Sequence, residues 1–253
     1  MSSGLHRLER FVDAHGPCVR RHWSRSPLAA DLGVDPSREV AAQRLAAAAG
    51  IAPQVLEFDP QRCTMTMHWI EGAPLEPDWV LRPMRRAAVA NLLERLRMLP
   101  PRGLPALDVT ARCLALHRSL QSLSGERADD FARELQDVLQ EARAVDLDST
   151  HCLVHGDLSA ANTVVRADGS LMLIDFEYAH AGSAQWDLAG LVTAVECDPV
   201  LGPAMRSFVN ECLPILAEPR QMSQFSARVR LRSLLDRLWW AVVRLQTGNA
   251  VDA

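Results

Sequence analysis

The amino-acid sequence predicts an α+β protein with a small β-rich N-terminal part and a mainly helical C-terminal part that contains one hairpin. Segments that alternate apolar and polar residues between turn signals come early in the chain, and this pattern is typical of strands. Later segments repeat apolar residues at intervals of three and four, which indicates helices. A chain of 253 residues can bury a sizeable core in one large or two modest domains.

Two hairpins and one helix are expected in the N-terminal part. The strands are expected at residues 7–13, 18–22, 54–58 and 63–70. Between the two hairpins, Asp35 is a good N-cap and Pro36 suits the first turn of a helix. The alanine-rich run that follows should end at Gly50, because glycine commonly follows the last helical residue.

The C-terminal part is expected to be helical except around one hairpin. Helices are expected at residues 84–99, 108–123 and 127–145, and over most of the chain after Asp187. The hairpin should consist of strands 163–165 and 171–174, joined by the turn residues 167–170. Asn162 precedes the first strand and Asp175 follows the second, so these side chains should lie side by side at its open end.

The loop before this hairpin carries Asp157, and the three polar residues suit metal-assisted phosphoryl transfer. A hydroxyl that attacks a γ-phosphate must be oriented and must lose its proton, and one carboxylate on a loop can do both. Asp157 is the candidate for this carboxylate. Mg²⁺ takes oxygen ligands and keeps several waters, so one amide oxygen and one carboxylate suffice on the protein side. Asn162 and Asp175 are the candidates for these two ligands.

Three motifs occur in order along this region, namely H-G-D-L-S-A-A-N at residues 155–162, L-I-D-F-E-Y-A at residues 173–179 and W-D-L-A at residues 186–189. Together they resemble the aminoglycoside phosphotransferase and choline kinase superfamily, in particular its thiamine kinase-like and choline kinase-like members. The resemblance implies a two-lobed protein-kinase-like fold, with residues 1–72 as a β-rich, nucleotide-binding N-lobe. Residues 73–253 would be a mainly helical C-lobe that holds the catalytic hairpin and the substrate site.

The resemblance also implies roles for the polar residues of these motifs. Asp157 would be the catalytic base, and Asn162 and Asp175 would bind magnesium. Asp187 would be a buried acid that holds the catalytic loop in place, and His155 would brace the same loop. The implied reaction moves the γ-phosphate of ATP, with Mg²⁺ as cofactor, to a hydroxyl group of a small molecule.

The nucleotide phosphates need a basic partner, and all 27 basic residues of the chain are arginines. A kinase ordinarily uses a lysine there. The resemblance implies Arg21 in the second strand as the replacement, and Arg20 is the alternative. A guanidinium can bind phosphate through two hydrogen bonds, so it can take over this contact. Glu39 lies where such folds place the acid that pairs with this base, so an Arg21–Glu39 pair is expected.

Two further nucleotide contacts are implied by the resemblance. Gly4 and the serines beside it are the only candidates for the small-residue loop that covers the phosphates, so this loop is abbreviated or formed differently. The other interpretation is that these residues are a frayed terminus. The segment W-I-E-G-A-P-L resembles the hinge between two kinase lobes, where adenine would contact the backbone around His68, Trp69 and Ile70. The lobe boundary is expected near Gly72.

The substrate-binding candidates are Glu177 and two tryptophans. Glu177 lies where choline kinase-like members often place an acid near metal or substrate. Trp239 and Trp240 cannot both lie on the apolar stripe of the last helical segment, so one is a candidate to face the substrate, although both could be packing residues. Aromatic faces bind quaternary or heteroaromatic cations. These features favour a small cationic alcohol of the thiamine, choline or ethanolamine type.

Two alternatives stay open on the sequence alone. An aminoglycoside O-phosphotransferase is the enzymatic one, although the C-terminal part looks short of the acidic insertions that a polycationic antibiotic would need. The other is a pseudokinase that binds nucleotide without turnover, because the lysine is missing and the phosphate loop is abbreviated. The intact trio of Asp157, Asn162 and Asp175 opposes this second alternative.

Composition bears on the partners and the compartment. The net charge is −4 and the isoelectric point is near 6.1, which argues against nucleic acid because no overall basic field is present. No apolar run is long enough to span a bilayer, and the N-terminus lacks a signal-peptide pattern. The six cysteines are scattered, as in reduced proteins. We expect a cytoplasmic protein that acts on a small molecule without a nucleic-acid or membrane partner; protein partners cannot be inferred.

Overall fold

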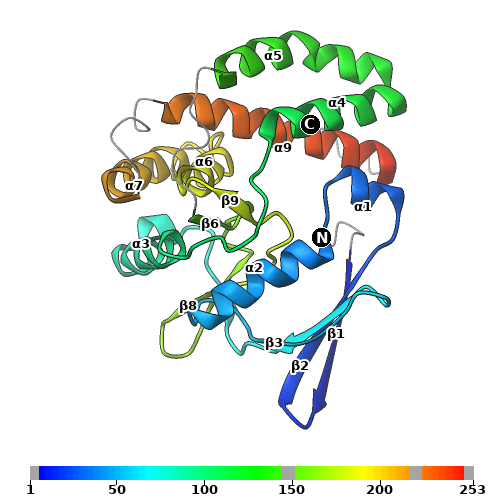
Figure 1. The fold of residues 1–253 in the computed structure, drawn as a ribbon. Coiled ribbons are helices and arrows are strands. Elements are labelled where there is room, and N and C mark those ends of the chain that lie inside the picture. Colours follow the sequence, from blue (N-terminus) through cyan, green and yellow to red (C-terminus); the bar gives the residue numbers. More distant parts are fainter. Residues whose placement is uncertain (1–5, 144–151, 217–223, 248–253) are drawn as a thin grey trace.

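The computed structural model describes residues 6–143, 152–216 and 224–247 (Figure 1). Its strands are β1 (His6–Asp13), β2 (Gly16–Trp23), β3 (Val55–Asp59), β4 (Thr64–His68), β5 (Ala73–Pro74), β6 (Cys152–Val154), β7 (Thr163–Val165), β8 (Leu171–Leu173) and β9 (His180–Gly182). Its helices are α1 (Pro27–Asp31), α2 (Pro36–Ala48), α3 (Pro83–Arg97), α4 (Val109–Leu123), α5 (Gly125–Arg143), α6 (Gln185–Thr193), α7 (Leu201–Leu216) and α9 (Phe225–Thr247), with a 3-10 turn η1 (Trp79–Leu81). The expected phosphate-loop residue Gly4 lies outside the described residues.

The N-terminal part is a four-stranded antiparallel sheet in the order β1-β2-β4-β3, with α2 beside it (Figure 1). β2 is an inner strand, and its Arg21 lies opposite Leu8 of β1 and Met65 of β4. A small apolar core joins the sheet to α2, and it consists of Val19, Trp23, Val40, Met65 and Met67. Because β2 contributes two residues to this core, the packing fixes the position of the strand and therefore of Arg21.

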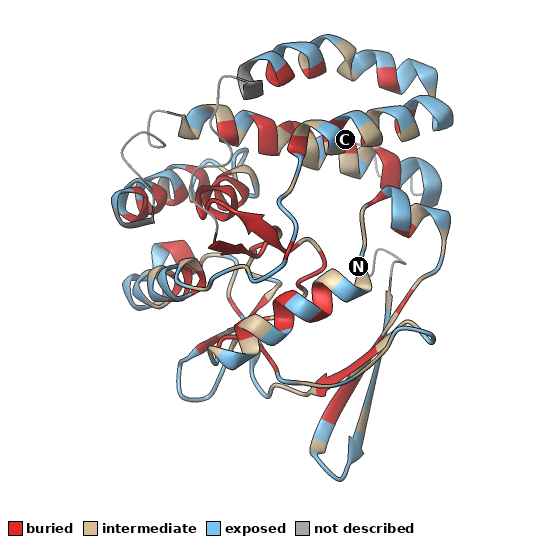
Figure 2. Cartoon of the chain, viewed as in Figure 1, coloured by how far each residue is buried: buried red, intermediate tan, exposed pale blue. Residues whose placement is uncertain are grey.

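The helix α2 lies between the sheet and the rest of the molecule. Asp35 caps its N-terminus by accepting hydrogen bonds from two backbone N–H groups, one of which belongs to Arg38. Val40 packs in the small core with the sheet, whereas Ala42 and Ala46 belong to the large core of the molecule. Figure 2 accordingly shows buried residues along much of this helix. The helix therefore couples the sheet to the C-terminal part.

After β4 the chain reaches the hairpin through the short strand β5, and Gly72 lies directly before this strand. β5 pairs with β7, and β7 pairs with β8, so this segment lies against the hairpin that the sequence predicts. A Cβ atom on Gly72 would lie 2.4 Å from the carbonyl oxygen of Val165. Only glycine permits two backbones to approach this closely. The position of the hairpin relative to the sheet therefore depends on this glycine.

The C-terminal part is built mainly from helices. α4, α5 and α9 pack against one another, and α6 packs against both α7 and α9 (Figure 1). The short antiparallel pair of β6 and β9 lies among them, and all of its residues are buried (Figure 2). β6 ends one residue before the loop that carries Asp157, so the large core supports that loop directly.

The structure confirms the α+β fold class, the two N-terminal hairpins and the main helices expected from the sequence. The sequence pattern does not predict the short elements α1, β5, β6 and β9. Segments of two to five residues are too short to show a period, so periodicity cannot reveal them. No helix in the described part of the chain is long and apolar enough to cross a membrane.

Candidate active site

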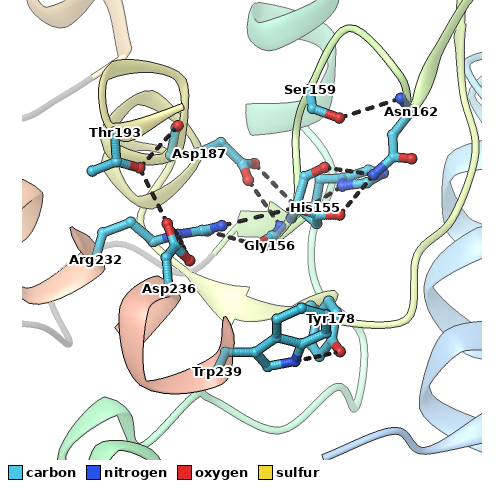
Figure 3. Close-up of polar contacts among 12 residues, drawn as sticks. His155, Gly156, Ser159, Asn162, Tyr178, Asp187, Thr193, Arg232, Asp236 and Trp239 are labelled. Carbon is cyan, nitrogen blue, oxygen red and sulfur yellow. Dashed lines mark hydrogen bonds and ion pairs between the residues drawn. The ribbon is translucent and has the colours of Figure 1, made fainter. Parts of the chain in front are cut away.

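The loop after β6 has a tightly constrained backbone. Gly156 has a φ of +81°, and a Cβ atom there would lie 2.2 Å from the carbonyl oxygen of Tyr178. The buried carboxylate of Asp187, in the first turn of α6, accepts hydrogen bonds from the backbone N–H groups of His155 at 2.9 Å and Gly156 at 2.8 Å (Figure 3). Asp187 therefore holds the two residues that immediately precede Asp157.

The His155 side chain is fully buried beneath the same loop. Its Nε2 atom lies 3.0 Å from the carbonyl oxygen of Ile174, and its Nδ1 atom lies 3.3 Å from the backbone nitrogen of Asp157. In this arrangement the Nδ1 atom lies where it can accept from the backbone N–H of Asp157, and the Nε2 atom lies where it can donate to the carbonyl of Ile174. The ring also packs against Phe176 at a centroid distance of 4.7 Å. His155 thus connects the loop to the segment that follows β8.

Asp157 and Asn162 contact each other directly. The Asn162 Nδ2 atom donates hydrogen bonds to the backbone carbonyl of Asp157 at 2.9 Å and to its Oδ2 atom at 2.8 Å. The amide oxygen of Asn162 points away from these contacts (Figure 3). The side chain of Asp157 is 43% exposed. Partial removal from water nevertheless raises the pKa of Asp157, while His155 and Arg232 act to lower it.

Asp175 lies at the open end of the hairpin. The backbone N–H of Ile174 donates a hydrogen bond to the carbonyl of Asn162 at 3.0 Å, so Asn162 and Asp175 occupy neighbouring positions, as the sequence predicts. Asp175 has a φ of +67°, a left-handed conformation that Asp and Asn adopt more readily than most residues. The loop and the hairpin thus bring Asp157, Asn162 and Asp175 together.

Arg21 is surrounded by buried carboxylates. Its Nε atom lies 3.2 Å from Glu39, its Nη1 atom 2.8 Å from Asp175 and its Nη2 atom 3.0 Å from Glu177. The Arg21–Glu39 pair expected from the sequence is therefore present. Burial, with a further effect of Asp175, raises the pKa of Glu177 to about 8, and burial raises the pKa of Glu39 to about 7 against the opposing effect of Arg21. One guanidinium thus faces three acids, which leaves acidic groups in excess beside Asp175.

A cavity of about 620 Å³ opens beside Asp157. Glu177, Tyr178 and both candidate tryptophans line it. The ring nitrogen of Trp239 donates a hydrogen bond to the hydroxyl of Tyr178 at 3.0 Å (Figure 3). Trp240 is 54% exposed, and its ring meets that of Trp239 edge to face at 4.9 Å between centroids. The final helix therefore gives the cavity an aromatic wall.

The expected hinge residues lie in the sheet and its exit. The backbone N–H of His68 donates to the carbonyl of Gln54 at 3.0 Å, and that of Trp69 donates to the carbonyl of Pro17 at 2.9 Å. Both N–H groups are thus engaged within the N-terminal part. His68, Trp69 and Ile70 do not line the cavity beside Asp157.

Comparison with known proteins decides the family. A family model described as the phosphotransferase enzyme family matches residues 9–218. The chain belongs to this family. A search of curated proteins by sequence finds no match.

Solved structures of kinases share the fold of this phosphotransferase. A choline/ethanolamine kinase family protein from Mesorhizobium loti is 21% identical, with a TM-score of 0.67 and coverage of 98% of this chain and 82% of that one. Choline kinase LicA from Streptococcus pneumoniae is 14% identical, with a TM-score of 0.73 and coverage of 97% and 88%. Amicoumacin kinase hAmiN, solved with AMP-PNP, Ca²⁺ and Ami, is 16% identical, with a TM-score of 0.64 and coverage of 98% and 81%. Aminoglycoside phosphotransferases also match, and the predicted kinase-like fold is confirmed.

The phosphotransferase site also contains Arg232 of α9, which the sequence pattern does not single out. Its Nη1 atom donates to the carbonyl of Gly156 at 2.6 Å, and its Nη2 atom lies 3.9 Å from Oδ1 of Asp157. Asp236 accepts from the Nε atom of Arg232 at 2.8 and 2.9 Å, and Thr193 donates to Asp236 at 3.2 Å (Figure 3). The i, i+4 spacing of Arg232 and Asp236 is a sequence signal for a helical ion pair. Only the fold shows that this pair contacts the loop.

The first prediction concerns the carboxylate that holds the loop. The Asp187→Ala variant leaves two buried backbone N–H groups without an acceptor, so its free energy of unfolding should fall by about 2 to 4 kcal/mol. Urea denaturation followed by circular dichroism measures this change. The exposed Asp130→Ala variant, on α5, is the matched control and should change stability by less than about 0.5 kcal/mol. A loss in Asp187→Ala no larger than in this control would contradict the assignment.

The second prediction concerns His180, which lines the cavity and contacts the carbonyl of Tyr178 at 2.9 Å. Burial lowers the pKa of His180 to about 4, below the value of about 6.5 expected in the unfolded chain. Between about pH 4 and pH 6.5 this histidine binds a proton in the unfolded chain but not in the folded protein. The neutral ring therefore contributes to the free energy of unfolding, and this contribution is complete above about pH 6.5 and is lost as the pH falls toward about 4. It amounts to on the order of 3 kcal/mol.

Urea denaturation of the wild type and of His180→Gln at several pH values between about 7 and 4.5 tests this expectation. The free energy of unfolding should decrease more steeply with falling pH in the wild type than in the variant, whatever their difference at neutral pH. Parallel pH dependences would show that the His180 ring does not stay neutral in the folded protein.

Proposed function

We propose that this phosphotransferase is a small-molecule kinase that moves the γ-phosphate of ATP to a hydroxyl of a small alcohol. The observation that carries the proposal is the position of Asp157, which contacts Asn162 and lines a cavity of about 620 Å³, a size suited to a small molecule. Residues 1–72 are proposed as the nucleotide-binding lobe and residues 73–253 as the catalytic and substrate-binding lobe. The choline and amicoumacin kinases that share the fold support this function.

Asp157 is proposed to orient the hydroxyl of the acceptor and to take its proton. Partial removal from water raises the pKa of Asp157, which makes it a better proton acceptor than a free carboxylate. Asn162 donates to one carboxylate oxygen and Arg232 lies near the other, so the carboxylate is oriented from two sides. His155 and Asp187 are proposed to support the loop. Transfer between two aligned groups then needs mainly positioning and charge neutralisation.

Asn162 and Asp175 are proposed to hold Mg²⁺. They supply one amide oxygen and one carboxylate, which is the donor chemistry that Mg²⁺ prefers. Among the described residues, no group of three or more His, Cys, Asp or Glu side chains is arranged to hold a metal ion. Two protein ligands are nevertheless enough for Mg²⁺, which commonly completes its shell with waters and substrate phosphates. Bound there, the ion would neutralise charge on the phosphates.

Arg21 and Glu39 are proposed to take the place of the lysine and its acidic partner. The three nitrogens of Arg21 each contact a carboxylate, and a guanidinium has five N–H donors, so two donors remain beyond these three contacts. The backbone around His68, Trp69 and Ile70 is proposed as the adenine site. These assignments rest on the resemblance and on the observed Arg21–Glu39 pair.

The acceptor is proposed to bind against the aromatic wall of the cavity. Tyr178, Trp239 and Trp240 can pack on a ring or an alkylammonium group, and this supports the cationic alcohols of the thiamine, choline or ethanolamine type expected from the sequence. Glu177 lines the same cavity, but its carboxylate contacts Arg21. An aminoglycoside is the less favoured acceptor, because a polycation needs several acids that are not already paired.

The third prediction tests the proposed base. The protein should release ADP from Mg-ATP faster when one compound of a panel is present. The panel consists of thiamine, choline, ethanolamine, an aminoglycoside, para-(hydroxymethyl)benzoate and para-(hydroxymethyl)phenyl phosphate. The Asp157→Asn variant should lower kcat by at least about 100-fold, because the acceptor hydroxyl loses its proton acceptor. A coupled ADP-release assay measures both rates.

The exposed Asp129→Asn variant is the control for this prediction and should keep wild-type kcat. Turnover that survives in Asp157→Asn would exclude Asp157 as the base. An ATP-induced rise in melting temperature without turnover for any alcohol would instead favour the pseudokinase interpretation.

The fourth prediction separates the two arginines proposed for the phosphates. Arg21→Met should raise the KM for Mg-ATP at least tenfold, since it removes the guanidinium proposed to bind the phosphates, which also contacts Glu39, Asp175 and Glu177. The neighbouring Arg20 contacts Thr66 and the Phe11 ring instead, so Arg20→Met should leave this KM within about twofold. Steady-state kinetics with ATP as the varied substrate measures both values. The opposite result would assign the phosphate contact to Arg20.

A further inference from the structure

Two arginines line the cavity and have only neutral partners. Arg38 comes from the first turn of α2, and Arg112 comes from the N-terminal end of α4. The Nη2 atom of Arg38 donates to the carbonyls of Gly33 at 2.5 Å and Glu177 at 2.9 Å. The Nη1 atom of Arg112 donates to the carbonyl of Asp31 at 2.7 Å. Within the part of the chain that the structure describes, neither guanidinium forms an ion pair.

The two guanidinium groups lie close together because both contact Gly33. Arg38 binds its carbonyl, and a Cβ atom on Gly33 would lie only 2.8 Å from the Cζ atom of Arg112. Gly33 has a φ of +74°, so the loop between α1 and α2 is shaped for this close approach. Burial lowers the pKa of Arg112, and the neighbouring charge of Arg38 lowers it further. The two positive charges are thus held side by side against their mutual repulsion.

Each of the two arginines also has a buried hydrogen-bond donor that contacts no acceptor among the described residues. The Nε atom of Arg38 and the Nη2 atom of Arg112 are buried, and neither has a hydrogen-bond partner among the described residues. A buried donor without a partner costs on the order of 1 to 3 kcal/mol, and more when the group is charged. An acceptor that carries negative charge would satisfy these donors and reduce the repulsion together.

The other arginines around the cavity already have acidic partners. These pairs are Arg232 with Asp236 and Arg237 with Glu134; Arg21, which contacts Glu177, does not line the cavity. Glu177 faces the Arg38–Arg112 pair with its backbone carbonyl only, because its carboxylate contacts Arg21. Asp31 likewise contacts Arg112 through its backbone carbonyl. Among the described residues of the cavity wall, the acids are therefore engaged elsewhere, and the Arg38–Arg112 pair is left with positive charge in excess.

We infer that the acceptor alcohol carries an acidic group, a carboxylate or a phosphate, that binds to Arg38 and Arg112. This inference rests on the proposed kinase function, since it concerns the molecule that Asp157 would act on. Guanidinium groups bind planar oxyanions through paired N–H donors. The acidic group would bind at the pair while the body of the molecule packs on Tyr178 and Trp239. An alcohol with both an ammonium and an acidic group fits this cavity; a polycation without an acid does not.

Matched probes that share one body and differ in one substituent test this inference. Suitable probes are para-(hydroxymethyl)benzoate, para-(hydroxymethyl)phenyl phosphate, para-(hydroxymethyl)benzyl alcohol and para-(hydroxymethyl)benzylamine. Isothermal titration calorimetry measures their binding to the full-length protein without any need for turnover. At least one acid-bearing probe should bind at least tenfold more tightly than the neutral alcohol, and more tightly than the amine. The benzoate and the phosphate arms show which acid is preferred.

Variants of the pair show where the acidic group binds. Arg38→Met and Arg112→Met should each remove most of the preference for the acid, whereas Arg112→Lys should retain part of it because the charge stays. Arg118→Met is the matched control: this exposed arginine lies on the same helix as Arg112 but outside the cavity, so the preference should be unchanged. Melting temperatures confirm that each variant folds. If Arg112→Met does not fold, Arg38→Met and Arg112→Lys decide the question.

The outcomes separate this inference from the proposed function. Tightest binding of the amine, equal binding of all probes, no measurable binding of the acids, or an acid preference that survives in both methionine variants would each overturn the inference. ADP release with a cationic alcohol and without acid preference would overturn it while leaving the kinase function intact. Acid-selective binding without Mg-ATP turnover for any alcohol would instead contradict the kinase function, and the Arg38–Arg112 pair would then bind the acid of a ligand that is not phosphorylated.

Discussion

The structure depends on the contacts of one buried arginine. Arg21 belongs to the N-terminal sheet, Glu39 belongs to α2, and Asp175 and Glu177 belong to the segment after the hairpin. A buried ion pair gains little over an apolar contact, but removal of one partner leaves an unpaired charge and is strongly destabilising. The position of the sheet relative to the hairpin is therefore fixed by a contact whose loss would strongly reduce the free energy of unfolding. The same contact holds Asp175 at the open end of the hairpin, next to Asn162.

Close backbone contacts fix the rest of the candidate site. Gly72 lies against Val165 and Gly156 lies against Tyr178, at distances that leave no room for a side chain. Asp187 then satisfies the N–H groups that the sharp turn at Gly156 would otherwise leave without partners. The loop that carries Asp157 is thus defined by steric exclusion on one side and by hydrogen bonds on the other. Preorganisation of this kind is what positional catalysis requires, because a misplacement of about 1 Å is costly.

The sequence predicts the residues whose chemistry is local and misses those whose role depends on distant segments. Asp157, Asn162 and Asp175 fall within 19 consecutive residues, and a loop and a hairpin bring them together without reference to the rest of the chain. Arg38 reads as an ordinary first-turn residue, because its contact with the Glu177 carbonyl joins positions 139 residues apart. The sequence pattern does not reveal the role of Arg232 either, because the Gly156 carbonyl that it contacts lies 76 residues earlier. Periodicity and spacing carry no information about such contacts.

The absence of lysine has a physical consequence for this site. A lysine ammonium is a compact point charge, whereas a guanidinium presents five donors in a fixed plane. Arg21 uses that plane to reach three carboxylates at once, and Arg232 uses it to join Asp236, the Gly156 carbonyl and Asp157. In both cases one side chain fixes the relative positions of several groups that come from separate elements. The arginines that have acidic partners therefore hold separate elements of the structure together. The Arg38–Arg112 pair lines the cavity without an acidic partner among the described residues, and for this reason we infer that it binds the acidic group of the molecule that enters there.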